Sequence, residues 1–293
     1  MKRLLSMAAA VATVLLLSVS QASAITGNYV KDFQHPFVGL AVFYDQDGQF
    51  VHRCSGSLLT PTVFLTAGHC VFGVDSARVY FEQDAGAQYD PATEHDPVSG
   101  YPDNCAPGTE DVCTTGSTLL SYGYDEFQTF PNTHDAGVVL LDNPIHLPEY
   151  GVLATAGSLD RLATRRGQQD ITFTSSGYGL SRTNPTGDVS FRIRLMAEKK
   201  LNNLRSHLTG GYNLQTSSNP GHGRGGECFG DSGGPIFYGP YSSNVIVGVV
   251  SFGLNNNCRG NDFEYRTDQR DFIEWLLASV PRSQASQIRF VNI

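Results

Sequence analysis

The feature that most constrains the fold of this chain is a series of short apolar runs separated by turn-forming residues. The runs are rich in Val, Ile, Phe, Thr and Tyr, and clusters of Gly, Pro, Asn and Asp lie between them. Many short strands joined by such turns favour a β-sandwich or a β-barrel. The predicted strands are residues 37–45, 55–68, 77–83, 136–142, 171–179, 189–200, 233–239 and 244–253.

One helix and two long loops complete the predicted organisation. Residues 268–280 carry apolar side chains at helical spacing, and Pro281 ends that segment. Residues 84–118 and 215–227 are polar and rich in turn-forming residues, so we expect both to be loops without regular structure. The chain is therefore predicted to be mostly β-structure with one helix near its end.

The first 24 residues differ from the rest of the chain. A short positive head precedes an apolar run at residues 4–19, and the small residues 22–24 follow. This three-part pattern predicts a secretory signal peptide over residues 1–24, with the mature chain beginning at Ile25. The alternative is a membrane anchor, but the run is shorter than the roughly 20 residues that a spanning helix needs. We therefore expect an extracellular protein that leaves the membrane once the signal peptide is removed.

The charge of the mature chain excludes some partners. Residues 1–24 contain two basic residues and no acidic one, so their removal changes the formal net charge from −8 to −10. A chain this acidic repels phosphate backbones, so nucleic acid is not an expected partner. With 40% hydrophobic residues the chain can bury a sizeable core, and its length permits one or two domains.

All six cysteines lie in the predicted mature chain. An even number of cysteines in a secreted protein predicts disulfide bonds. A metal site is the competing interpretation, but no Cys-x-x-Cys or His-Glu-x-x-His spacing is present, so no metal is expected. Closeness in sequence suggests the pairs Cys54–Cys70, Cys105–Cys113 and Cys228–Cys258.

Three separated stretches carry residues suited to nucleophilic catalysis. Each alone has an ordinary structural explanation, such as a buried histidine or a tight glycine turn. Together, in the order His69, Asp135 and Ser232, they resemble the chymotrypsin-like (trypsin-like) serine peptidase family, and specifically a secreted, microbial-type member. That order differs from the order in subtilisins and α/β-hydrolases. The stretches are LTAGHC at 65–70, THDAGVVLLDNPI at 133–145 and CFGDSGGP at 228–235.

The resemblance covers most of residues 25–280 and implies a fold. That fold is all-β, with two six-stranded antiparallel β-barrels and a C-terminal α-helix. Residues 25–150 would form the N-terminal barrel, which carries His69 and Asp135. Residues 151–293 would form the C-terminal barrel, which carries Ser232, the terminal helix and the tail.

The chemistry that the resemblance implies follows from the residue types. A serine hydroxyl is a poor nucleophile at neutral pH, so Ser232 needs His69 as a base that takes its proton. Asp135 would hold the imidazole in the useful tautomer, and Asp142 is the rival for this role. The backbone N–H groups of Gly230 and Ser232 would bind the oxyanion of the tetrahedral intermediate. No cofactor is implied.

The predicted specificity pocket departs from that of trypsin. The resemblance implies that Gly226 takes the position at the pocket base where trypsin has an aspartate. Glu227 follows it and is a candidate for binding a basic side chain, with a solvated loop carboxylate as the alternative. On the opposite wall the alignment is ambiguous by one residue, and Phe263 is expected to narrow the pocket. The implied substrate-binding residues are Gly226, Glu227, Ser251, Phe252, Gly253 and Phe263.

The start of the mature chain has its own implied role. The residues ITGN at 25–28 resemble the sequence that begins the active form of these peptidases. Signal peptide removal would then free the Ile25 ammonium to pair with the buried Asp231, since an unpaired buried charge is costly. The alternative is that Ile25 is an ordinary residue and that other donors satisfy Asp231.

These observations predict a secreted serine endopeptidase that hydrolyses peptide bonds through an acyl-enzyme intermediate. Its expected partners are protein or peptide substrates and a protein inhibitor, and it is expected to be a monomer. The alternatives are a catalytically silent binding protein on the same fold and an esterase that uses the same three residues.

Overall fold

A computed structural model describes residues 25–293 except 88, 91, 93, 96–97, 102–104, 106–111, 164–170, 184–186 and 219. The predicted signal peptide, residues 1–24, and parts of the predicted 84–118 loop lie outside the described residues. Within the described part of the chain, no helix is both long and apolar enough to cross a membrane.

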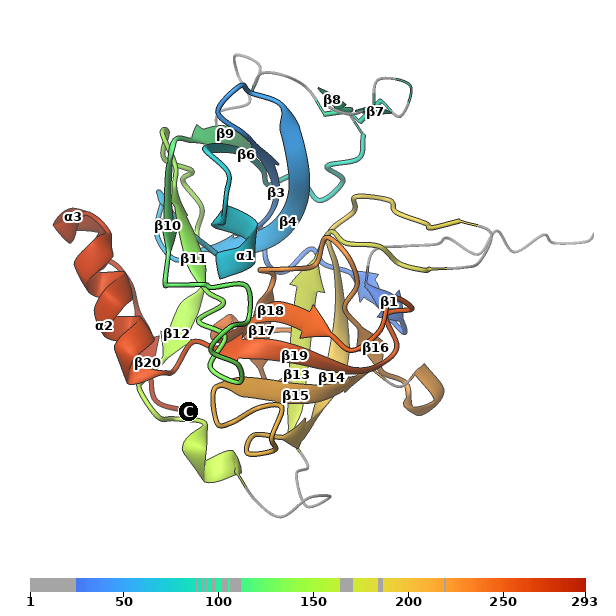
Figure 1. Ribbon diagram of the computed structural model, residues 1–293, viewed down its shortest axis with the longest axis vertical. Coiled ribbons are helices and arrows are strands. Elements are labelled where there is room, and N and C mark those ends of the chain that lie inside the picture. Colours follow the sequence, from blue (N-terminus) through green and yellow to red (C-terminus); the bar gives the residue numbers. More distant parts are fainter. Residues whose placement is uncertain are drawn as a thin grey trace, which may run out of the picture.

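The first half of the chain forms a seven-stranded sheet that curves into a barrel (Figure 1). Its strands pair in the order β10-β11-β5-β4-β3-β6-β9, and every pairing is antiparallel. The predicted strand at 55–68 is a hairpin, because the chain turns where Leu59 N donates to Val63 O. The strands are β3 (Val38–Tyr44), β4 (Phe50–Leu58), β5 (Val63–Thr66), β6 (Ser76–Tyr80), β9 (Cys113–Gly116), β10 (Thr118–Ser121) and β11 (Gly137–Leu140).

The second half, together with β2 from near the start of the described chain, forms a nine-stranded sheet, in which β17 pairs with both β13 and β18 and so closes a second barrel. The segment 215–227, predicted to be an irregular loop, contains most of β15, which pairs with β14 and β19. Its side-chain alternation buries Thr216 and Leu214 despite the polar composition. The strands are β2 (Val30–Lys31), β12 (Val152–Ala154), β13 (Thr172–Gly177), β14 (Leu195–Asn203), β15 (Asn213–Ser218), β17 (Pro235–Tyr238), β18 (Val245–Gly253), β19 (Gly260–Arg266) and β20 (Phe290–Val291).

The remaining elements are short, apart from the predicted helix. That helix is α2 (Arg270–Ser279), which packs the fully buried Phe272 and Leu276 into the core, a burial worth about 1.5–3 kcal/mol for each side chain. The other elements are α1 (Gly68–Val71), α3 (Arg282–Ala285), η1 (Asp160–Leu162), η2 (Pro220–His222), the pair β1 (Thr26–Gly27) with β16 (Gly225–Gly226), and the pair β7 (Glu94–His95) with β8 (Val98–Ser99).

The two barrels pack against each other through a buried contact centred on Tyr178. The Tyr178 hydroxyl donates to Glu82 O at 2.7 Å and accepts from Arg194 Nη1 at 3.0 Å. Arg194 Nη1 also donates to Val38 O and Phe81 O, so residues of both barrels meet there. The two-barrel arrangement and the C-terminal helix are those predicted from the sequence. The strand numbers exceed six because short strands such as β9 and β20 extend the edges.

All three predicted disulfides are present. Cys54–Cys70 joins β4 to α1, and Cys228–Cys258 joins the loop before β17 to the loop between β18 and β19. Two of the three bridges therefore brace the segments that carry the motifs with His69 and Ser232.

Candidate active site

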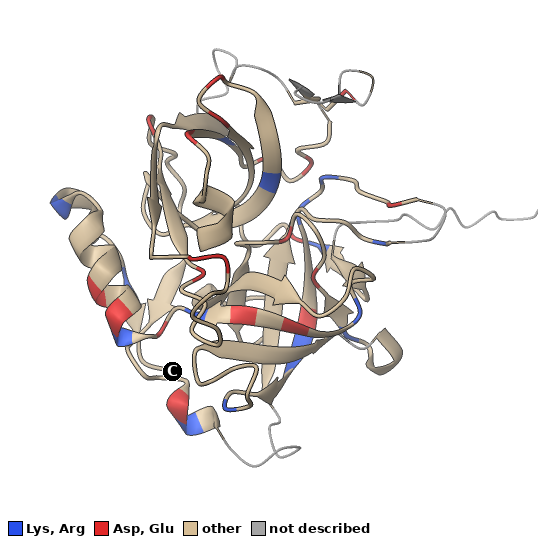
Figure 2. Ribbon diagram, viewed as in Figure 1, with Lys and Arg blue, Asp and Glu red and all other residues tan. Residues whose placement is uncertain are grey.

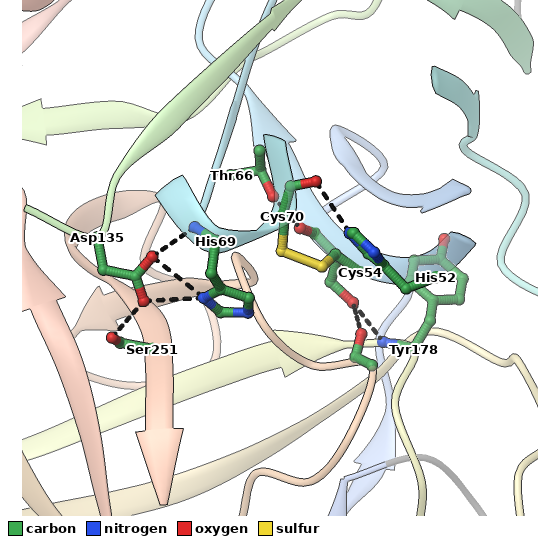
Figure 3. Close-up of a disulfide and its surroundings, with 10 residues drawn as sticks. His52, Cys54, Thr66, His69, Cys70, Asp135, Tyr178 and Ser251 are labelled. Carbon is green, nitrogen blue, oxygen red and sulfur yellow. Dashed lines mark hydrogen bonds and ion pairs between the residues drawn. A yellow bond between two sulfur atoms is a disulfide. The ribbon is translucent and has the colours of Figure 1, made fainter. Parts of the chain in front are cut away.

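His69 and Asp135 form the central contact of the candidate site (Figure 3). His69 Nδ1 lies 2.9 Å from Asp135 Oδ2 and 3.1 Å from Oδ1, and the His69 backbone N–H donates to Oδ1 at 2.7 Å. His69 belongs to α1, and Asp135 is a fully buried residue just before β11. Two neighbouring elements of the first barrel thus fix the imidazole through its Nδ1 atom, and Nε2 is left for a second partner.

Ser251 adds a third contact to this carboxylate. Its Oγ donates to Asp135 Oδ2 at 2.5 Å from the end of β18 in the second barrel. The resemblance had placed Ser251 only in the substrate-binding segment. Asp142, the rival carboxylate, is exposed and accepts bonds from Thr115 and Ser117 outside the site.

The contact between His69 and Asp135 raises the pKa of His69 and lowers the pKa of Asp135. Burial raises the pKa of Asp135, but the charge of His69 and the hydrogen bonds from His69 and Ser251 outweigh it, so this pKa lies below its usual range. Burial lowers the pKa of His69, but the charge and hydrogen bond of Asp135 outweigh that effect and raise it. The carboxylate therefore stays ionised and stabilises the imidazolium.

Hydrogen bonds from Ser55 and two glycines fix the segment around Ser232. Ser55 N donates to Ser232 O, and Ser55 Oγ donates to Gly230 O, both at 2.8 Å. Gly230 and Gly233 have φ angles of 94° and 77°, in the left-handed region that favours glycine. A Cβ atom on Gly233 would lie 2.1 Å from Thr66 Oγ1, so this position has no room for a side chain.

A cavity of about 360 Å³ brings His69 and Ser232 together. The predicted substrate segment, residues 251–253, lines it, as does the disulfide Cys228–Cys258. Among the described residues, His69 is hydrogen-bonded to Asp135. Ser232 and His69 both line the cavity, but no hydrogen bond joins them. Hydrogen bonds of this kind commonly tighten only when substrate is bound.

The opposite wall of the cavity corrects one sequence prediction. Phe263 does not line the cavity; it is fully buried and stacks on Phe252 with ring centroids 4.6 Å apart. The pairing of β18 with β19 places Phe263 opposite Phe252 and Asp262 opposite Gly253. Because side chains alternate along a strand, Asp262 faces the cavity and Phe263 does not narrow it.

Of the two residues predicted at the pocket base, Glu227 lines the cavity and Gly226 does not. Gly226 pairs with Thr26 in the two-stranded sheet and is not among the residues that line the cavity. Glu227 does line it and is buried, which excludes the alternative of a solvated loop carboxylate. Sequence reasoning missed Lys199, whose ammonium contacts Glu227 beneath the cavity. Its only signal in the sequence was its place near the end of the predicted strand 189–200.

Asp231 and Ile25 are both fully buried. The Asp231 carboxylate accepts from Gly179 N at 2.8 Å and from Cys228 N at 3.0 Å. Burial raises its pKa to about 7 despite these bonds. Among the described residues Asp231 makes no ion pair, and Ile25, still joined to Ala24 in the full chain, carries no ammonium. The pairing of Ile25 with Asp231 therefore stays a prediction.

Known proteins share this architecture. The family profile described as Trypsin matches residues 25–276. The chain is 25% identical over 269 residues to CLIP domain-containing serine protease B10 of Anopheles gambiae, covering 88% of this chain and 70% of that protein. It is 26% identical over 249 residues to trypsin zeta of Drosophila erecta, covering 80% and 77%.

A solved structure described as HL collagenase matches with a TM-score of 0.62 and 18% identity, covering 87% of this chain and 97% of that one, which supports the fold. The sequence relatives named above come from insects, so a microbial-type member finds no support. Because the family profile spans most of the described residues, the chain belongs to the trypsin family of chymotrypsin-like serine proteases.

Proposed function

We propose that the protein is a secreted serine endopeptidase in which Ser232 is the nucleophile, His69 the general base and Asp135 the residue that orients it. Membership of the trypsin family supports a peptidase that acts on protein substrates. The observation that carries the assignment is the pairing of His69 Nδ1 with Asp135, on the wall of a cavity that also exposes Ser232.

The proposed reaction has two balanced steps. Ser232 Oγ attacks the carbonyl carbon of the peptide bond while His69 Nε2 takes its proton. The C–N bond then breaks, the amine leaves with that proton, and an acyl-enzyme remains. A water molecule attacks the ester carbon in the second step, with its proton passing through His69 back to Ser232. Asp135 stabilises the imidazolium throughout.

The oxyanion of each tetrahedral intermediate would be bound by the backbone N–H groups of Gly230 and Ser232. The left-handed φ of Gly230 supports this, because it turns the loop while Gly230 O is held by Ser55. Neither N–H makes a hydrogen bond to another described residue. A single donor of this kind contributes about 3–4 kcal/mol to transition-state stabilisation.

Labelling with a fluorophosphonate, which reacts with activated serines, tests the proposal directly. We expect one phosphonate on Ser232, located by mass spectrometry of peptides, together with cleavage of casein. A catalytically silent binding protein would take no label, and an esterase would be labelled without cleaving casein. The presence of all three residues in intact motifs favours the peptidase over both alternatives.

We expect the activity to fall on the acid side with a single protonation. Only the neutral imidazole of His69 can take the Ser232 proton, and Asp135 raises the pKa of His69 above its ordinary value of about 6.5. The logarithm of kcat/KM for a peptide substrate should therefore decline with unit slope below that raised pKa. A midpoint well below about 6.5 would contradict the role given to the pair.

Ser251→Ala should lower kcat about 10- to 100-fold with little change in KM, because it removes one charge-assisted bond of about 1.5–3 kcal/mol from the Asp135 carboxylate. Steady-state kinetics on a peptide p-nitroanilide would measure this. Ser117→Ala is the matched control, since Ser117 Oγ donates a similarly short bond of 2.6 Å to Asp142 outside the site. Equal effects of the two changes would show that the bond to Asp135 has no catalytic role.

A further inference from the structure

The base of the cavity is built on a buried lysine. Lys199 lies on β14 with a fully buried side chain, which is rare for lysine unless its charge is paired. Its Nζ atom lies 2.7 Å from Glu264 Oε1 and 2.8 Å from Asp262 Oδ2, and it also contacts Glu227 Oε1. We call these four residues the Lys199 cluster.

The Lys199 cluster carries more negative than positive charge. One ammonium faces three carboxylates, so the cluster has a net charge of −2 when all four groups are ionised. Figure 2 shows acidic positions along β19 close to a basic position on β14. No other charged group makes an ion pair with these carboxylates among the described residues. A net buried charge of this kind is costly unless a further cation approaches.

The carboxylates of the Lys199 cluster are not equivalent. Glu264 Oε1 also accepts from Thr216 Oγ1 at 2.6 Å, and Asp262 Oδ2 accepts from Glu227 N at 3.0 Å. The side chain of Glu227 has no such hydrogen bond, and its Oε2 atom has no partner in the described part of the chain. Glu227 and Asp262 line the cavity, whereas Lys199 and Glu264 lie behind them. The open side of the cluster therefore presents two carboxyl groups to the same space as Ser232.

Burial and neighbouring charges raise the pKa of Glu227 and also the pKa of Lys199. Burial and the neighbouring carboxylates of Glu264 and Asp262 raise the pKa of Glu227 well above its usual range, and the contact with Lys199 only partly opposes them. Burial would lower the pKa of Lys199, but the three carboxylates raise it instead, so the lysine stays charged. A cation entering the cavity would hold Glu227 in its ionised form.

The geometry points to Lys199 as a specificity-determining residue that holds the carboxyl groups of Glu227 and Asp262 at the cavity base, so that the cavity takes an arginine or lysine side chain of the substrate. The bond cleaved would be the one on the carboxyl side of that residue. Lys199 supplies a counter-charge that opposes the rise in the pKa of Glu227, and the cation of the arriving substrate would add to this effect. This inference rests on the proposed peptidase function, and it locates the cation recognition in residues other than Gly226.

A binding experiment tests the inference without catalysis. In the full chain with Ser232→Ala, benzamidine should bind at least about 30-fold more tightly than the neutral benzyl alcohol, because it would form a buried charge pair. Adding Glu227→Gln should weaken benzamidine about 30-fold or more and leave benzyl alcohol unchanged. Glu198→Gln is the matched control, because Glu198 neighbours Lys199 on β14 but pairs with Arg224 away from the cavity.

Two outcomes of the binding experiment would overturn the inference. Equal affinity for the two compounds would show that Lys199 neutralises the cavity base. Equal weakening by Glu227→Gln and Glu198→Gln would show that the cation binds elsewhere. Neither outcome affects the proposed peptidase function, which is tested separately by the labelling of Ser232. If the Glu227 variant does not fold, the same test can be made with Asp262→Asn, which removes the other cavity-lining carboxylate.

A second experiment tests Lys199 itself through pH. The ratio of kcat/KM for an arginine substrate to that for a leucine substrate should fall as the pH falls through the pKa of Glu227, since protonation removes its charge. The ionisation of His69 affects both substrates and cancels in the ratio. Lys199→Met should move the midpoint of this ratio to higher pH, because the remaining carboxylates lose their cation. An unchanged midpoint, or a ratio that favours leucine at every pH, would overturn the role of Lys199.

Discussion

Ser232→Ala should lower kcat/KM for a peptide substrate by about 10⁴-fold or more while leaving the fold intact. Without the hydroxyl no acyl-enzyme can form, and only substrate binding and the oxyanion donors remain to stabilise attack by water. Progress curves with an arginine and a leucine p-nitroanilide would measure the loss. Thermal unfolding should show little change, since the Ser232 backbone keeps its bond to Ser55.

The matched control for this variant is Ser283→Ala, which removes an exposed hydroxyl from α3 and should leave kcat/KM unchanged. If Ser232→Ala kept a substantial part of the activity in a preparation free of other peptidases, Ser232 would not be the nucleophile. The proposed mechanism would then have to be abandoned even if the fold assignment stood.

The site residues could be predicted from sequence because each lies in a short sequence motif. Around His69, Asp135 and Ser232, the geometry of the site restricts which residues can occupy the neighbouring positions. Gly233 shows this directly, because a side chain there would meet Thr66 within 2.1 Å. Such steric demands leave a readable pattern in a single sequence, and the three disulfide pairs were also predictable because their partners lie close along the chain.

The cavity base could not be predicted in the same way. Its charges come from β14, β19 and the segment after β16, and only the closed barrel brings Lys199 to Glu227 and Asp262. The error at Phe263 has the same origin. A shift of one residue along a strand exchanges the two faces, and sequence alone did not fix the register that places Asp262 opposite Gly253.

The elements themselves show where local propensity fails. The apolar run 55–68 predicts one long strand, but backbone bonding between Leu59 and Val63 turns it into the hairpin of β4 and β5. Conversely, the polar segment 215–227 predicts a loop, but its first residues extend β15 because β14 and β19 supply partners on both sides. Neighbouring strands decide such cases, and they are distant in sequence.

Retention of Ala24 should lower kcat/KM by about 100-fold or more relative to a chain that begins at Ile25, because breaking a buried ion pair costs about 3–5 kcal/mol. Only the shorter chain has an α-ammonium at Ile25 to pair with Asp231. Without it, Asp231 keeps two backbone donors and a pKa raised by burial to about 7, so its charge is poorly compensated near neutral pH. Asp231 directly precedes Ser232, so its position bears on the oxyanion donors. Kinetics on the two chains, with their N-termini verified by mass spectrometry, would measure the effect.

The same ion pair predicts a loss of activity at alkaline pH in the chain that begins at Ile25. Pairing with Asp231 should raise the Ile25 α-amino pKa above its ordinary value of about 7.7–8.0. The stabilisation is complete below that ordinary value and disappears as the pH rises through the raised one. Acetylation of Ile25 should remove both the activity and its alkaline midpoint. If the Ala24-containing, acetylated and free chains were equally active, the N–H groups of Gly179 and Cys228 would suffice to hold Asp231, and the mature N-terminus would have no role in catalysis.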